Sequence, residues 1–168
     1  MNQNFSVKRR NQVWVSDITY IETTNGWVYL TVIIDLFDRK VIGWSPSEDM
    51  TTENTIVEAW YAAVENRPIN KKLTFHSDRG SQYASTIFRN ILKSYGKQVK
   101  QSMSRKGNCW DNAVAESFFK SLKTEWVYKK HYKVYSDAEP SIFKWIETWY
   151  NRNRRHSALN YITINELG

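Results

Sequence analysis

Three acidic residues have neighbours that suggest a metal-binding role. Asp17 lies within residues 13–21, a run rich in β-branched and aromatic residues that predicts a β-strand. A carboxylate in such surroundings needs a hydrogen-bond donor, an opposite charge or a cation. Asp78 follows a short apolar run, and Glu116 lies in an amphipathic segment. Three carboxylates without nitrogen or sulfur ligands suit a hard cation, Mg²⁺ or Mn²⁺.

Such a cluster has a specific chemistry. Two divalent ions about 4 Å apart can activate the attacking oxygen and stabilise the leaving oxygen of an in-line phosphoryl displacement. The ions also offset the repulsion between carboxylates, which otherwise raises their pKa values. We therefore expect two ions at this site. We interpret His76 as a packed strand residue rather than a ligand, and Asp35 and Asp38 as structural residues of a turn.

The elements that must position these acids follow from the hydrophobic pattern. Periods of two and of 3.6 residues separate strands from helices. The predicted strands are residues 13–21, 26–35, 39–46, 73–77 and 97–103. The predicted helices are residues 52–66, 85–95 and 112–128, with a last helix from Ser136, where a capping box is expected. Residues 104–111 are predicted to form a loop, and the tail after Arg152 is polar and basic.

This order predicts an α/β fold with a mixed five-stranded sheet and helices on both faces. The first three strands have short connections and should form an antiparallel meander. The strand at 73–77 should lie parallel to the strand at 13–21 and beside it. Asp17 would then lie close to Asp78.

A helical wheel begun at Asn112 puts the apolar side chains of its helix on one face. Glu116 and Lys123 fall together at the edge of that face, with Lys120 nearby. Glu116 could point along the sheet towards the two aspartates, and Lys123 could reach a phosphate. The alternatives are a solvated charged face and, for Asp111 and Asn112, simple N-caps.

Composition bounds the possible partners. The chain has 168 residues, a net charge of +7 and a pI of about 9.4, which favours a polyanionic partner. Its one cysteine and scattered histidines exclude a disulfide and a cysteine-rich zinc site. We find no apolar signal core and no apolar run long enough to cross a membrane, so we expect a soluble, intracellular protein. Residues 1–12 are predicted to form a basic arm, and residues 13–168 one catalytic core domain.

Four stretches of the sequence resemble a known family. They are WVSDITYI, HSDRGSQY, QSMSRKGNCWDNAVAESFFKSLKTE and WYNRNRRHSALNYIT, and they span residues 11–163. The chain resembles the integrase core domain of D-D-E transposases from bacterial insertion sequences, the group closest to retroviral integrases. HSDRGSQY together with QSMSRKGNCWDNAVAESFFKSLKTE is the most specific part of this resemblance.

The resemblance implies a ribonuclease-H-like fold in which Asp17, Asp78 and Glu116 are the catalytic, metal-binding triad. It also gives Lys123 a contact with DNA near the cleaved end. The implied reaction is metal-dependent hydrolysis at transposon ends, followed by attack of the freed 3′-OH on another phosphodiester. DNA is the implied partner, with a homo-oligomer assembled on it, in the cytoplasm and nucleoid of a bacterium.

The chain departs from the family pattern in three places, the least consequential being Thr163-Ile164, where the family often has Thr-Pro. Residues 79–115 form a slightly longer segment between the second and third acids than is usual. The helix-turn-helix region that recognises transposon ends in whole transposases is not found in this sequence, so we expect it on a separate or missing segment. These departures keep two alternatives open: a remnant that only binds DNA or associates with subunits, and a nuclease that cuts without joining. The candidate DNA contacts are Lys123, Lys120, Arg105, Lys106 and Asn112.

Overall fold

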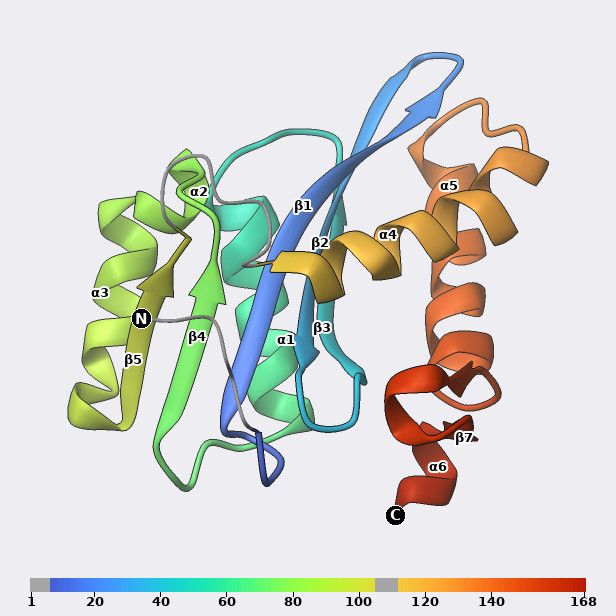
Figure 1. The fold of residues 1–168 in the computed structure, drawn as a ribbon. Coiled ribbons are helices and arrows are strands. Elements are labelled where there is room, and N and C mark those ends of the chain that lie inside the picture. The colour runs from blue at the N-terminus through green and yellow to red at the C-terminus, as the bar shows by residue number, and fades with distance from the viewer. Residues whose placement is uncertain (1–6, 105–111) are drawn as a thin grey trace.

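A mixed five-stranded sheet forms the centre of the structure, a computed structural model that describes residues 7–104 and 112–168 (Figure 1). Its strands are β1 (Val13–Thr23), β2 (Gly26–Asp35), β3 (Val41–Ser47), β4 (Leu73–Ser77) and β5 (Val99–Met103). The strand order is β3-β2-β1-β4-β5. The first three strands pair antiparallel, and β4 lies parallel to both β1 and β5. The predicted fold class, with its meander and two parallel strands, is confirmed.

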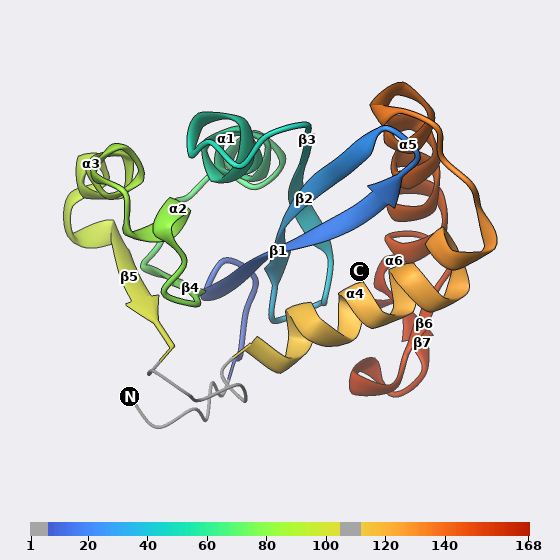
Figure 2. The ribbon, with the colours of Figure 1, turned by 90° about the horizontal axis from the view of Figure 1, so that it is seen from above.

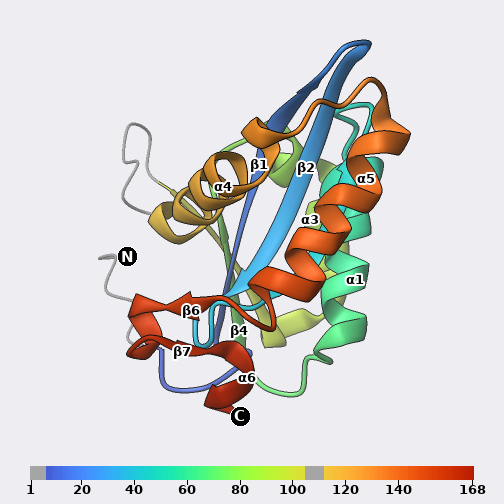
Figure 3. The ribbon, with the colours of Figure 1, turned by 90° about the vertical axis from the view of Figure 1, so that its right-hand side faces the viewer.

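Helices cover both faces of this sheet (Figure 2). The helices are α1 (Glu58–Asn66), α2 (Ser81–Ala84), α3 (Thr86–Ser94), α4 (Ala113–Glu125), α5 (Tyr135–Phe143) and α6 (Ile164–Leu167). Figure 3 shows α4 on the side of the sheet opposite α1, and buried residues of α5 belong to the same core cluster as those of α4. A two-stranded ribbon of β6 (Arg155–His156) and β7 (Ile162–Thr163) precedes α6 near the C-terminus. None of the described helices is long and apolar enough to cross a bilayer.

Alternation along β1 divides the core into two clusters. Val13, Val15 and Ile21 point towards α4 and α5, whereas Trp14 points towards α1 and α3. Successive strand residues face opposite sides of a sheet, so Asp17 belongs to the α4 face. Asp17 therefore lies on the same face of β1 as the apolar side chains of Val13, Val15 and Ile21.

Several element boundaries differ from the predictions. The predicted helix 52–66 begins as a π-helical turn (Glu53–Val57), and α2 precedes the helix predicted at 85–95. The expected capping box at Ser136 is wrong, because α5 begins at Tyr135. The Asp137 carboxylate accepts from the backbone N–H groups of residues 133 and 134 instead.

The described part of the predicted basic arm, residues 7–12, contacts the sheet. Arg9 donates to the carbonyl of Lys72, and Arg10 pairs with Asp38 at 2.9 Å. The backbone N–H of Asn11 donates to a carboxylate at the end of β2. The boundary between arm and core domain stays a prediction.

Candidate functional site

The strand pairing brings Asp17 and Asp78 to the same level of the sheet. The parallel register of β1 and β4 pairs Val15 with His76 and ends there, and β4 itself ends at Ser77. Two residues further along lie Asp17, within β1, and Asp78, the first residue after β4; paired strands are about 4.8 Å apart. The Asp78 carboxylate is oriented by the backbone N–H of Gly80, which donates to Oδ1 at 2.7 Å.

Glu116 reaches this level because α4 is attached to β1 at its start. The side chain of Asn112, the residue before α4, donates from Nδ2 to the backbone carbonyl of Ser16 at 3.0 Å. Asn112 is buried, and its Oδ1 has no hydrogen-bond partner within the described ranges. Glu116 follows in the first turn of the helix, on the solvent-exposed side.

Electrostatics shows that the three carboxylates interact. The pKa of Asp17 is raised to about 7, chiefly by burial and to a smaller extent by the charges of Asp78 and Glu116, while the N–H of Ile18, which donates to Oδ1 at 2.9 Å, opposes the rise. No described lysine or arginine forms an ion pair with any of the three acids. The ionised carboxylate of Asp17 therefore has no compensating charge among the described residues, and a bound cation would stabilise it.

The donor set fits a hard divalent cation, although the side chains are not closed around one. Over residues 7–104 and 112–168, no three His, Cys, Asp or Glu side chains stand close enough together to hold an ion. The mutual effect on the pKa of Asp17 nevertheless places Asp78 and Glu116 within electrostatic reach.

Buried polar residues support the strand under Asp17. The Ser16 hydroxyl lies 2.8 Å from the hydroxyl of Tyr83 and donates to the Val32 carbonyl at 2.8 Å. Tyr83 is fully buried; desolvation and then the nearby charge of Asp17 raise the pKa of its hydroxyl. The sequence motif HSDRGSQY contains Tyr83, but nothing in the sequence pattern indicated that it contacts Ser16.

His76 has a structural environment, as predicted. It is buried within β4, with Nδ1 2.9 Å from the Ser102 hydroxyl and Nε2 3.2 Å from that of Ser104. Both ring nitrogens thus have partners on the neighbouring chain segment.

The candidate DNA contacts have different environments. Lys123 is half-buried two turns after Glu116, and desolvation lowers the pKa of its ammonium. Lys120 is exposed on the same helix, and Asn112 is buried against β1. Arg105 and Lys106 lie outside the described residues. The DNA contacts of all five stay predictions.

The fold matches that of a solved integrase catalytic core domain. The HTLV-2 integrase catalytic core domain in complex with magnesium superposes with a TM-score of 0.66 at 19% identity, covering 93% of this chain and 95% of that chain. The sheet order and the helices on both faces therefore define a ribonuclease-H-like fold.

Sequence comparison then identifies the family. An integrase core domain family matches residues 7–109, and a second integrase core domain family matches residues 97–163. The chain belongs to the integrase core domain family, as its motifs indicated.

Two relatives are bacterial transposases. The transposase for insertion sequence element IS904 of Lactococcus lactis subsp. lactis (strain IL1403) is 43% identical over 96% of this chain and 62% of that protein. Transposase InsF for insertion sequence IS3A of Escherichia coli (strain K12) is 43% identical over 94% of this chain and 54% of that protein. The chain thus spans little more than half the length of these relatives.

Proposed function

We propose that this domain is the catalytic core of a DNA transposase that cuts DNA strands and joins the resulting 3′-OH to another phosphodiester. The observation that carries the proposal is that β1, the end of β4 and the first turn of α4 bring Asp17, Asp78 and Glu116 within electrostatic reach of one another. Three elements that are distant in the sequence deliver an oxygen-only donor set whose charge no described basic residue offsets. Membership of the integrase core domain family supports the same reading.

We further propose that the three acids hold two divalent ions, Mg²⁺ or Mn²⁺. When bound, such ions supply an activated attacking oxygen and stabilise the leaving oxygen. Asp17 and Asp78 provide fixed ligands, because β1 and the N–H of Gly80 orient them. Glu116 is the adjustable ligand, since it projects from the exposed side of α4.

The remaining residues position the DNA and the ligands in this proposal. Lys123 neutralises a phosphate near the cleaved bond, because its desolvated ammonium has no hydrogen bond or ion pair with another described residue. Asn112 sets the distance between α4 and β1. Ser16 and Tyr83 make the floor beneath Asp17 rigid.

The wider assembly is also a proposal. The relatives are named transposases, and the structural neighbour is a trimeric form of an integrase core with magnesium. We infer that this domain acts on transposon ends as a homo-oligomer, with a helix-turn-helix region for end recognition on a separate segment. Such a substrate would place it at the nucleoid in a bacterial cytoplasm.

A cleavage and joining assay tests the proposed function. The chain is incubated with Mn²⁺ or Mg²⁺, a labelled duplex carrying a candidate transposon end and a target duplex. We expect cleaved and joined products, and loss of both with Asp17→Asn, Asp78→Asn or Glu116→Gln. Glu65→Gln on α1 is the charge-matched control, because Glu65 is exposed and α1 packs on the face of the sheet opposite α4. Products that persist in all three triad variants would refute the assignment.

A further inference from the structure

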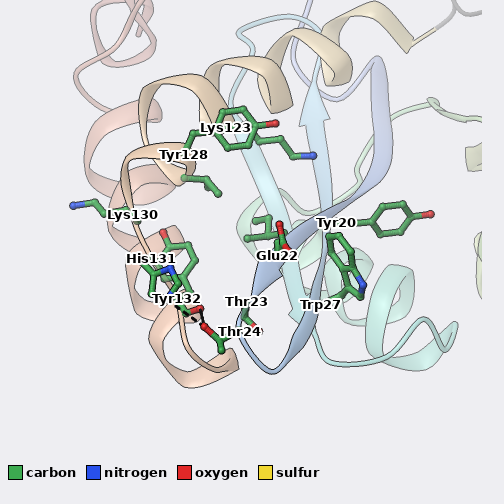
Figure 4. A pocket seen from close by; sticks show the side chains of 12 residues that line it. Tyr20, Glu22, Thr23, Thr24, Trp27, Lys123, Tyr128, Lys130, His131 and Tyr132 are labelled. Atoms are coloured by element: carbon green, nitrogen blue, oxygen red, sulfur yellow. Dashed lines mark hydrogen bonds between the residues drawn. The ribbon is translucent and has the colours of Figure 1, made fainter.

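A pocket lies between the β1–β2 hairpin and the segment that follows α4 (Figure 4). Its volume is about 550 Å³, within the range of pockets that hold small organic groups. The buried side chains of Ile21, Val127 and Tyr132 make its apolar floor.

Backbone hydrogen bonds fix the two walls of this pocket to each other. At the hairpin tip, the N–H of Thr24 donates to the carbonyl of Tyr132 at 2.9 Å, and the N–H of Asn25 donates to that of Lys133 at 3.0 Å. The Thr24 hydroxyl also lies 3.2 Å from Nε2 of His131. The pocket is therefore closed at its far end and preformed.

Exposed aromatic rings surround the pocket. The exposed fractions are 55% for Tyr20, 53% for Trp27 and 71% for Tyr128, all high for such large apolar side chains. Tyr20 makes edge contacts with Trp27 at 6.3 Å and with Tyr29 at 5.5 Å between ring centroids. The rings of Tyr20 and Trp27 are thus held in place on the hairpin without being buried. Their exposed ring faces are available to a planar ligand.

The charges in the pocket suit a nucleotide rather than a simple anion. Lys123 and Glu22 both line it, and neither has an ion pair with another described residue. In Figure 4, Lys123 and Tyr128 lie on one side, Tyr20 and Trp27 on the other, and Glu22 between them. A lysine can bind a phosphate, while a carboxylate repels phosphate but accepts hydrogen bonds from the amino group of a base.

The distance between the pocket and the proposed metal site corresponds to a few nucleotides of one DNA strand. Tyr20 is three residues beyond Asp17 on β1, roughly 10 Å at about 3.3 Å per residue. Lys123 is about two turns beyond Glu116 on α4, also roughly 10 Å. Nucleotides of one strand rise by about 3.4 Å each, so about three nucleotides separate the two sites.

We propose that this pocket binds an unpaired base of the DNA strand, about three nucleotides from the bond that is cleaved. The base stacks on Trp27 and Tyr128, its phosphate contacts Lys123, and Glu22 accepts from its amino group. This inference rests on the proposed function for the identity of the strand. A paired base could not enter, because its faces are stacked and its Watson–Crick edge is occupied.

Fluorescence of 2-aminopurine tests the proposal directly. The base analogue is placed in the short single-stranded extension of an otherwise paired DNA, at each of the first few unpaired positions. We expect its fluorescence to be quenched on binding to the intact chain and restored in Trp27→Ala and Tyr128→Ala. Stacking contributes about 1–3 kcal/mol per base, so affinity for extended DNA should fall about tenfold or more. Affinity for blunt duplex should stay within about twofold.

Control variants separate stacking from loss of folding. Trp27→Phe and Tyr128→Phe keep an aromatic face and should retain the quenching. Tyr61→Ala removes an equally exposed aromatic residue on α1 and should change nothing. Quenching that persists in both alanine variants, or an equal loss of affinity for blunt and extended DNA, would overturn the proposal.

The cleavage assay distinguishes this failure from failure of the proposed function. Cleavage by the intact chain without any 2-aminopurine quenching would refute the pocket and leave the transposase assignment standing. Quenching that depends on Trp27 and Tyr128 in a chain that cleaves no DNA would support the pocket and count against the assignment.

Discussion

Asp17→Asn should stabilise the protein in the absence of metal, although we expect the same substitution to abolish activity. The carboxylate of Asp17 is desolvated and repelled by two other acids, which raises its pKa from 3.8 to about 7. A difference of one in pKa corresponds to about 1.4 kcal/mol, so the ionised carboxylate costs about 4 kcal/mol at most. Partial solvent exposure screens this charge, and we take about 2 kcal/mol as the expected gain.

The pH dependence of this gain follows from the direction of the pKa change. The folded protein binds the Asp17 proton more tightly than the unfolded chain does. The stability associated with Asp17 is therefore fully present below pH 3.8, falls as the pH rises, and is lost above about pH 7. Asparagine does not titrate and can still accept from the N–H of Ile18. The stability difference between variant and parent should thus grow from near zero at pH 4 to about 2 kcal/mol at pH 8.

Denaturant unfolding with a chelator present, followed by tryptophan fluorescence at several pH values, measures this difference. In thermal unfolding, about 2 kcal/mol corresponds to a rise of roughly 4–8 °C for a domain of this size. Saturating Mn²⁺ should raise the stability of the parent and leave Asp17→Asn nearly unchanged, because only the parent keeps the full ligand set. A variant that is no more stable than the parent at pH 8, with a difference independent of pH, would refute the reasoning.

Three further predictions concern residues that support the site or the fold. Gly80→Ala should weaken Mn²⁺ binding about tenfold or more in calorimetry, because the added Cβ would lie 2.9 Å from Oδ1 of Asp78; an unchanged affinity would contradict this. Asn112→Ala should lower the cleavage rate more than it lowers the melting temperature, since its amide ties α4 to β1; equal rates would count against it. Burial favours the protonated form of Asp38, but hydrogen bonds and the charge of Arg67 outweigh this and lower its pKa. The contribution of Asp38 is therefore present above pH 3.8 and lost as the pH falls, so Asp38→Asn should destabilise the protein at pH 7 and flatten the acid side of its stability curve.

The proximity of Asp17 and Asp78 could be predicted, because a parallel strand order fixes where neighbouring strands end. Glu116 could be placed from helical periodicity alone. The hydrogen bond from Asn112 to Ser16 could not be predicted, because it depends on how a helix packs against a strand about 100 residues away in the sequence. Local pattern carries no information about such a contact.

The hairpin pocket also escaped sequence reasoning. Tyr20 and Trp27 look like ordinary strand residues in the sequence, and only the extension of β1 to Thr23, beyond the end of β4, leaves them exposed. Lys123 was singled out for a phosphate, but its proximity to the hairpin required the packing of α4. The sequence indicates only a polar and basic tail after Arg152, whereas in the structure this tail forms β6, β7 and α6.

Binding of Mn²⁺ to the intact chain is the most direct test of the central claim that three carboxylates form one metal site. Calorimetric titration at pH 8, above the raised pKa of Asp17, should give saturable binding of about two ions in the parent and in Glu65→Gln. The same titration should lose saturable binding in Asp17→Asn and weaken it strongly in Glu116→Gln. Equal binding curves for the parent and both triad variants would contradict the account.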